Sequence, residues 1–129
     1  MTINHKLFLN LAFQIAERNL GKTGQNPTVG SIVVKNDTVI SSGVTSINGR
    51  PHAEFNALNK VKNTAGSTLY TTLEPCIHRG KTPPCVNIII KKKIRNVFFG
   101  LEDPDLRTFK KAKKILSSKG IVTKLIRSK

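Results

Sequence analysis

The order of apolar patterns along the chain is the feature that most restricts its fold. Apolar residues recur at helical spacing over 4–20 and 52–61, and two β-rich runs lie between them at 29–34 and 38–44. The patterns that follow predict an extended run over 67–72, a helix over 84–92, an extended run over 97–100, a helix over 106–119 and a strand over 121–126. This order, αββαβαβαβ, predicts an α/β fold in which helices cover both faces of a mixed sheet of about five strands.

Local signals mark the ends of several of these elements. Leu7, Leu11 and Ile15 lie one turn apart in the first helix, which we expect to end at Gly21. Asn36-Asp37 joins the two β-rich runs and predicts a hairpin. The lysine-rich amphipathic helix near the end of the chain is stopped by Gly120.

The length and the apolar content predict one compact domain over residues 1–129. The apolar-rich stretch 7–16 is interrupted by polar residues, whereas a membrane span needs about 20 apolar residues, so no transmembrane helix is expected. Glu17 and Arg18 directly follow this stretch, and it lacks a small-residue cleavage pattern, which argues against a signal peptide. We therefore expect a cytoplasmic protein.

The charge is strongly positive and unevenly placed. The chain has 22 Lys and Arg against 7 Asp and Glu, a formal net charge of +15. Residues 91–129 contain thirteen of the basic residues and three acidic ones. Such a stretch attracts phosphate, either on a nucleic acid or on a small anionic substrate. The other interpretation is a lysine-rich helix face that is simply solvated.

Three short segments carry residues suited to metal chemistry. They are His52-Ala53-Glu54 at a helix start, Pro75-Cys76 after a predicted strand, and Pro83-Pro84-Cys85 at the start of the next helix. One histidine and two cysteines offer the nitrogen and thiolate donors that Zn²⁺ prefers. Three protein ligands leave one position for a water molecule, which ionises more easily there than in bulk water. Glu54 can face the same cleft without ligating the metal, so it is the candidate proton shuttle.

The order of these segments is typical of zinc deaminases that act on bases, which carry H-x-E and then P-C-x-x-C, with the glutamate as acid/base. Here eight residues, rather than two, separate Cys76 from Cys85. The segment Leu-Glu-Pro-Cys-Ile-His-Arg-Gly-Lys-Thr-Pro-Pro-Cys over 73–85 resembles the zinc motif of the riboflavin-pathway pyrimidine deaminases, which have this long spacing. The resemblance runs from Asn-Pro-Thr-Val-Gly at 26–30 to Glu-Asp-Pro at 102–104.

The resemblance implies a fold, a reaction and a cofactor. The fold is the cytidine-deaminase-like three-layer α/β/α sandwich, which agrees with the element order. The reaction is the zinc-dependent hydrolytic deamination of 2,5-diamino-6-ribosylamino-4(3H)-pyrimidinone 5′-phosphate, with His52, Cys76 and Cys85 holding the Zn²⁺ and Glu54 moving protons. The family often carries a C-terminal NADPH-dependent reductase, for which this length leaves no room, so we expect no nicotinamide site. Relatives of this fold commonly associate, so a homo-oligomer is expected.

The resemblance also implies contacts to a phosphorylated pyrimidine substrate. Asn26 would contact the pyrimidine or ribose, while His78, Lys81 and Asp103 would line the pocket, with Lys81 as the phosphate partner. The interpretation of Asn26 as a turn residue before proline, and of Lys81 as a solvated loop lysine, stays open.

Some positions depart from the family pattern. The family usually has histidine where this chain has Thr45, and asparagine where it has Asp105. An acidic residue at 105 repels a phosphate unless a cation such as Arg107 offsets it. The substrate therefore stays open to a related aminopyrimidine.

Other interpretations of the same residues remain. Cys76 and Cys85 are also compatible with buried apolar thiols, and His78 with a fourth ligand in a closed structural zinc site. The helix macrodipole explains an acid such as Glu54 in a first turn, but not its pairing with His52. A nucleic-acid deaminase would use the same chemistry and explain the charge, although few aromatic residues are left to stack bases. A non-catalytic zinc-stabilised binding module is the third class.

Overall fold

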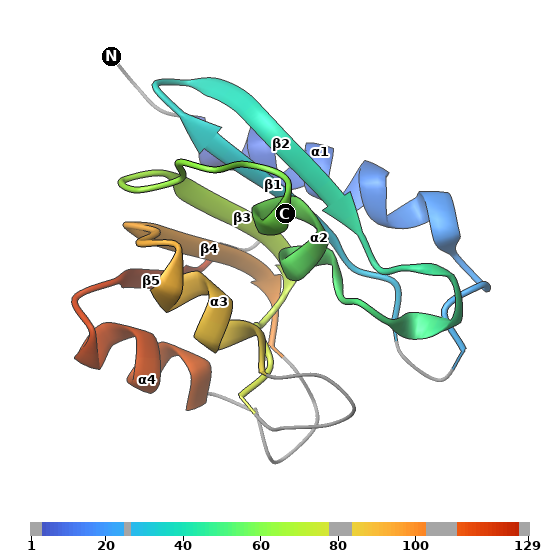
Figure 1. Ribbon diagram of the computed structural model, residues 1–129. Coiled ribbons are helices and arrows are strands. Elements are labelled where there is room, and N and C mark those ends of the chain that lie inside the picture. Colours follow the sequence, from blue (N-terminus) through green and yellow to red (C-terminus); the bar gives the residue numbers. More distant parts are fainter. Residues whose placement is uncertain (1–3, 25–26, 78–83, 103–110, 127–129) are drawn as a thin grey trace.

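The computed structural model describes residues 4–24, 27–77, 84–102 and 111–126 and confirms the predicted element order (Figure 1). The helices are α1 (His5–Ala16), α2 (Ala53–Asn59), α3 (Cys85–Lys91) and α4 (Lys111–Ser118). The strands are β1 (Gly30–Lys35), β2 (Thr38–Val44), β3 (Thr68–Leu73), β4 (Asn96–Leu101) and β5 (Val122–Leu125). Residues 106–110 of the last predicted helix lie outside the described residues.

The strands form one mixed sheet in the order β2-β1-β3-β4-β5. β1 runs antiparallel to β2 and to β3, whereas β3, β4 and β5 are parallel to one another. Parallel strands end at the same edge of a sheet, and Leu73 of β3 pairs there with Leu101 of β4. Open α/β sheets bind ligands outside this carboxyl edge. The segment that follows β3 therefore begins where a ligand site is expected.

The predicted hairpin between β1 and β2 is confirmed. Asn36 and Asp37 have φ values of 52° and 61°. Two successive residues at positive φ are typical of a type I′ turn, whose twist matches that of the paired strands.

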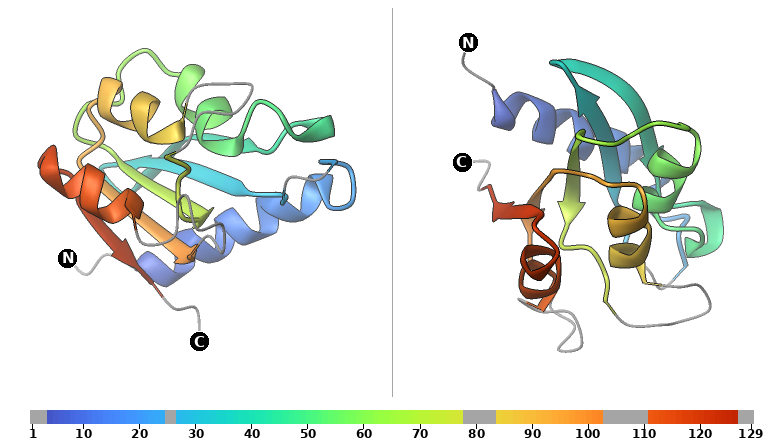
Figure 2. Two further views of the ribbon diagram at one scale, coloured as in Figure 1. Left: turned by 90° about the horizontal axis from the view of Figure 1, so that it is seen from below. Right: turned by 60° about the vertical axis from the view of Figure 1, so that its left-hand side comes forward.

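Helices cover both faces of the sheet, which makes the three predicted layers (Figure 2). Of the α-helices in the described segments, α1 lies on one face, and α2, α3 and α4 lie on the other. Side chains of β1 alternate between the two cores: Ile32 and Val34 pack under α1 with Tyr70 and Phe98, while Val33 belongs to the core under the other helices.

Two glycines allow helices to approach the antiparallel half of the sheet closely. A Cβ built on Gly30 of β1 would lie 1.9 Å from the backbone oxygen of Ala12 in α1. A Cβ on Gly43 of β2 would lie 2.5 Å from the backbone oxygen of Ala53 in α2. Glycine at these positions therefore fixes how near α1 and α2 lie to their strands.

The first helix is shorter than the apolar pattern predicts. α1 ends at Ala16 and continues as a 3-10 turn, η1 (Glu17–Asn19). The Thr28 hydroxyl donates to the Ala16 carbonyl at 2.6 Å, while the Leu20 N–H bonds to the Glu17 carbonyl. A side chain from a distant segment thus replaces the next helical hydrogen bond, which a local pattern does not reveal. A second 3-10 turn, η2 (Ile47–Gly49), was not predicted.

The prediction on membrane spans was tested over the described segments. None of their helices is long and apolar enough to cross a bilayer.

Candidate active site

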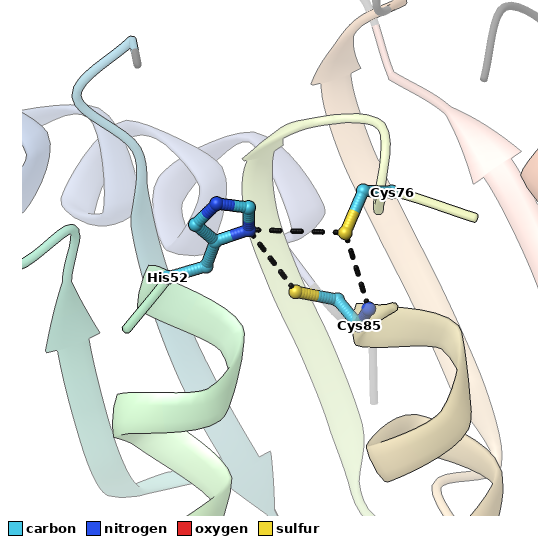
Figure 3. A group of neighbouring side chains, drawn as sticks. All are labelled: His52, Cys76 and Cys85. Atoms are coloured by element: carbon cyan, nitrogen blue, oxygen red, sulfur yellow. Dashed lines mark hydrogen bonds between the residues drawn. The ribbon is translucent and has the colours of Figure 1, made fainter. Parts of the chain in front are cut away.

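Three residues from separate segments meet beside the carboxyl edge of β3 (Figure 3). His52 is the N-cap residue of α2 and Cys85 is the first residue of α3. Cys76 lies between them in sequence, just after β3 ends at Leu73. The potential ligand atoms of the three side chains all lie within 4.8 Å of one another. The structure therefore brings together the three residues predicted as metal ligands.

The histidine presents one defined nitrogen to the sulfurs. His52 Nδ1 lies 3.7 Å from Cys76 Sγ and 3.5 Å from Cys85 Sγ. The backbone N–H of Cys85 donates to Cys76 Sγ at 3.1 Å. These contacts fix the rotation of the imidazole ring and the direction of both sulfurs.

The spacing of these donor atoms fits a zinc ion. Bonds of about 2.0–2.1 Å to nitrogen and about 2.3 Å to sulfur at a tetrahedral angle separate the two donors by about 3.6 Å. The observed distances of 3.5 Å and 3.7 Å agree with this separation. The donor set of one imidazole and two thiols is also the one that zinc prefers, so the residues fit the metal in both chemistry and geometry.

The electrostatics of the group favour one ionised thiol in the absence of metal. Hydrogen bonding from Cys85 lowers the pKa of Cys76 to about 4, against the opposing effect of burial. The pKa of the buried Cys85 is raised well above its ordinary value by the hydrogen bond to Cys76 and by burial. The pKa of His52 is raised, chiefly by its hydrogen bond to Cys76. Cys76 therefore offers the thiolate form that binds metals.

Glu54 lies in the first turn of α2 and is almost completely enclosed. Its side chain is 4% exposed, and its Oε1 atom has no hydrogen-bond partner among the described residues. Burial raises the pKa of Glu54 to about 7. A buried oxygen without a partner is costly, so it is typical of a group kept for a ligand or a reaction. A helix macrodipole explains an acid at this position but not its burial.

A cavity of about 510 Å³ opens between α2 and α3 next to the ligand group. His52 and Cys85 form part of its wall, together with the apolar side chains of Phe55 and Ile88. Its volume lies in the range of pockets that bind small molecules. The two helices thus leave space beside two of the three ligand residues.

The predicted substrate contacts fall on segments that the structure does not describe. Asn26, His78, Lys81 and Asp103 all lie outside the described residues, as does Asp105. Their roles, and the possibility that His78 is a fourth ligand, stay predictions.

Thr45, where the family pattern has histidine, is described and is 1% exposed. Its hydroxyl accepts a hydrogen bond of 2.9 Å from the backbone N–H of Val29. Its own N–H donates to the Val29 carbonyl at 2.9 Å. Thr45 therefore ties the end of β2 to the residue before β1, which is a structural task.

Sequence reasoning missed Arg50, which lies against the outer edge of the ligand histidine. Arg50 Nη1 is 3.3 Å from His52 Nε2, and its positive charge acts to lower the pKa of His52. Arg50 lies two residues before His52 in the sequence, but no local pattern indicated that its side chain meets the imidazole ring.

Sequence reasoning also gave no role to Glu74, which is buried at the start of the segment joining β3 to Cys76. Glu74 is 2% exposed, and its Oε2 accepts a hydrogen bond of 3.3 Å from the backbone N–H of Ala112 in α4. Its own N–H donates to the Leu101 carbonyl at the end of β4. Glu74 thus anchors the loop that carries Cys76 to two neighbouring elements.

Comparison with known proteins identifies similar chains. Residues 2–101 match the family described as the cytidine and deoxycytidylate deaminase zinc-binding region. The riboflavin biosynthesis protein RibD of Bacillus amyloliquefaciens is 42% identical over 118 residues, which are 91% of this chain and 32% of that protein. The diaminohydroxyphosphoribosylamino-pyrimidine deaminase of Buchnera aphidicola subsp. Schizaphis graminum is 39% identical over 121 residues, 93% of this chain and 82% of that protein.

A solved structure of a similar protein has the same fold. The crystal structure of a diaminohydroxyphosphoribosylaminopyrimidine deaminase/5-amino-6-(5-phosphoribosylamino)uracil reductase from Thermotoga maritima superimposes with a TM-score of 0.85 at 35% identity. The superposition covers 96% of this chain and 36% of that one. The chain thus spans about a third of the length of the RibD relatives it matches.

Proposed function

Because this chain belongs to the cytidine and deoxycytidylate deaminase family, and within it to the diaminohydroxyphosphoribosylamino-pyrimidine deaminases, we propose that it is a hydrolytic deaminase. Its proposed substrate is 2,5-diamino-6-ribosylamino-4(3H)-pyrimidinone 5′-phosphate, from which it removes an amino group. The products are the corresponding pyrimidinedione and ammonia. The observation that carries the proposal is the buried Glu54 carboxyl, whose Oε1 has no partner in the described segments and which lies two residues from His52.

His52 Nδ1 and the sulfurs of Cys76 and Cys85 hold the zinc in this proposal. The metal supplies a Lewis acid that makes a water molecule nucleophilic at neutral pH. The backbone N–H of Cys85 stabilises the Cys76 thiolate, and the contact to both sulfurs keeps the His52 ring in one orientation. These contacts preorganise the ligands before the metal arrives.

Glu54 moves the protons of the reaction. Its Oε1 takes a proton from the water that attacks the amino-bearing ring carbon and passes a proton to the ring nitrogen. It then takes the proton of the newly formed hydroxyl and delivers it to the departing amine as the carbon–nitrogen bond breaks, so ammonia leaves and a carbonyl forms. A pKa of about 7 suits both steps, because the carboxyl gives and takes protons with similar ease near neutral pH.

The test is ammonia release from the diaminopyrimidine ribotide by zinc-loaded protein, with Glu54→Gln as the variant and Glu17→Gln as the matched control. Glu17 is exposed on η1, so its amide should leave turnover unchanged. Turnover that disappears in Glu54→Gln while zinc stays bound supports the proposal. A zinc-loaded protein without turnover contradicts the substrate, and a Glu54→Gln variant with full turnover contradicts the role of Glu54.

Nucleic acid is the second substrate class, and the net charge of +15 is the observation that favours it. Stacking platforms are scarce, because Phe55, at 39% exposure, is the one aromatic among the large exposed apolar side chains of the described segments. Binding of RNA that weakens steeply with salt, together with RNA deamination, would establish this class instead.

A further inference from the structure

The segment between β2 and α2 brings His52 to the sulfurs without the usual local support. β2 ends at Val44, and residues 45–51, which include η2, lead to His52 as the N-cap residue of α2. An N-cap side chain normally accepts a hydrogen bond from the first turn of its helix, which fixes the chain where the helix begins. Within the described chain His52 makes no such bond, and its ring is directed instead to Cys76 and Cys85 (Figure 3). Other contacts must therefore hold the start of α2 in place.

Asn56, one turn into α2, supplies such contacts from a single amide group. Its Nδ2 atom donates to the Val44 carbonyl at 2.8 Å, to the Ser46 hydroxyl at 2.9 Å and to the Pro51 carbonyl at 3.3 Å. Two of these acceptors are backbone carbonyls, which cannot donate, so the atom that faces them is the amide nitrogen. The backbone N–H of Asn56 bonds to the His52 carbonyl at 3.0 Å. Asn56 thus joins the end of β2, the segment that follows it and the predicted metal ligand.

The Val44 carbonyl lies on the outer edge of the sheet. β2 is the outermost strand on its side of the described sheet. The N–H of Thr45 bonds inward to the Val29 carbonyl, and the Val44 carbonyl belongs to the same peptide unit. The N–H and C=O groups of a trans peptide unit point in opposite directions, so the Val44 carbonyl points away from β1. The amide of Asn56 therefore gives this carbonyl a partner that the described strands do not provide.

Lys60 makes a second bond of the same kind one turn farther along α2. Its ammonium group donates to the Ser42 carbonyl, two residues before Val44 in β2. Residues four apart in a helix are separated by about 6 Å and residues two apart in a strand by about 7 Å, so both bonds form at once. Asn56 and Lys60 thus fix α2 along the edge of β2, and Asn56 is the one nearer to His52.

We propose that Asn56 is a positioning residue for the metal ligand His52. Its amide ties the start of α2 to the edge of β2 and to the segment that carries His52, and it thereby holds Nδ1 at the separation from the two sulfurs that fits zinc. A ligand that is already in position binds a metal without the cost of ordering the segment that carries it. This inference rests on the zinc-binding part of the proposed function and not on the substrate.

The test is the zinc affinity of the full chain, measured by competition with a chromophoric chelator at a temperature where circular dichroism shows each variant to be folded. Asn56→Leu keeps the approximate volume of the side chain and removes both N–H donors. We expect zinc affinity to fall about tenfold, because residues that orient metal ligands typically contribute about 10–100-fold.

Cobalt(II) in place of zinc gives a second measurement that separates positioning from stability. The visible absorption of the bound cobalt depends on the geometry of its ligands. We expect the cobalt spectrum of Asn56→Leu to differ from that of the wild-type chain. A loss of stability alone leaves the spectrum of the folded protein unchanged.

Lys60→Met is the matched control, because it removes the same kind of bond to the same strand one turn farther from His52. It should retain the zinc affinity and the cobalt spectrum of the wild-type chain. Wild-type zinc affinity in Asn56→Leu overturns the proposal. An equal loss of affinity in Lys60→Met also overturns it, because the two bonds would then act only through the stability of α2.

Ser46→Ala keeps the test decisive if Asn56→Leu does not fold. It removes one of the three acceptors of the Asn56 amide, so we expect zinc affinity to fall about threefold, the ratio that corresponds to one weak hydrogen bond. Wild-type affinity in Ser46→Ala then overturns the proposal.

These measurements do not involve turnover, so the inference and the proposed function fail in different ways. A chain that shows this pattern of zinc affinities but does not deaminate the ribotide supports the inference and contradicts the proposed substrate. A wild-type chain that binds no zinc overturns both.

Discussion

The two faces of the sheet differ in whether a buried polar group has a hydrogen-bond partner among the described residues. Under α1, the hydroxyl of Tyr70 is bonded to His5 Nδ1 at 2.6 Å, and the rings of Phe8 and Phe98 pack around the pair. Under α2, Oε1 of the buried Glu54 has no partner among the described residues. A buried polar group with a hydrogen-bond partner lowers the free energy of unfolding little, whereas one without a partner lowers it more. A protein that keeps such a group is expected to use it in its function.

The buried titratable groups of the two faces also differ in the pH at which they change protonation state. Burial raises the pKa of Tyr70 to about 12, so this phenol stays neutral in any physiological buffer. Burial raises the pKa of Glu54 to about 7, so this carboxyl changes its protonation state near neutrality. The α1 face therefore serves stability, and the face formed by α2 and α3 carries the reactive groups.

The largest difference between the two faces is expected when the histidine on each face is replaced by alanine. His52→Ala removes a proposed metal ligand, so we expect bound zinc to fall below stoichiometric and ammonia release to be lost. His5→Ala removes an imidazole under α1, so zinc content should stay as in the wild-type chain. Zinc is measured by atomic absorption after dialysis. Stoichiometric zinc in His52→Ala would show that other residues hold the metal.

The next largest effect is expected from Glu54→Gln, which keeps the shape of the side chain but removes its proton transfer. Turnover should fall by about 10²–10⁴-fold with zinc retained. The melting temperature should stay the same or rise, because a buried carboxyl oxygen without a partner is replaced by a neutral amide. Steady-state kinetics, zinc content and thermal melts check the three parts. A variant that loses zinc and activity together would make Glu54 a structural residue.

The two close-approach glycines offer a matched pair of stability variants. Gly30→Ala pushes against α1 and Gly43→Ala against α2, so each should lower the free energy of unfolding by about 1–3 kcal/mol. Only Gly43→Ala should also weaken zinc binding, since α2 positions His52. Urea unfolding gives the first quantity and chelator competition the second. Equal losses of zinc affinity in both variants would mean that the faces are coupled.

The smallest effect is expected from Tyr70→Phe, which removes one satisfied hydrogen bond. The loss in free energy of unfolding should be about 1 kcal/mol, because the partly exposed His5 can turn to water instead. Turnover per folded molecule should not change. A marked drop in kcat at a temperature where the variant is folded would place the α1 face in the catalytic machinery.

Much of this architecture follows from local signals in the sequence. Period-2 and period-3.6 patterns identified every described α-helix and β-strand, though not the 3-10 turns, because a side chain's face is set by its position within its own element. The ends were less predictable: α1 stops at Ala16 because Thr28 bonds to its carbonyl. The turn at Asn36-Asp37 was predictable because these residue types tolerate positive φ.

The sequence by itself also determined the donor set, since only histidine and cysteine side chains supply the nitrogen and sulfur that zinc prefers. The tertiary structure decided that His52, Cys76 and Cys85, which span 33 positions, present their donor atoms within 4.8 Å of one another. It also decided which nitrogen of His52 faces the sulfurs, and that Arg50 lies at the other nitrogen. These relations depend on the strand order and on the packing of α2 against Gly43. Both result from contacts between residues that are far apart in the sequence, so no local sequence pattern reveals them.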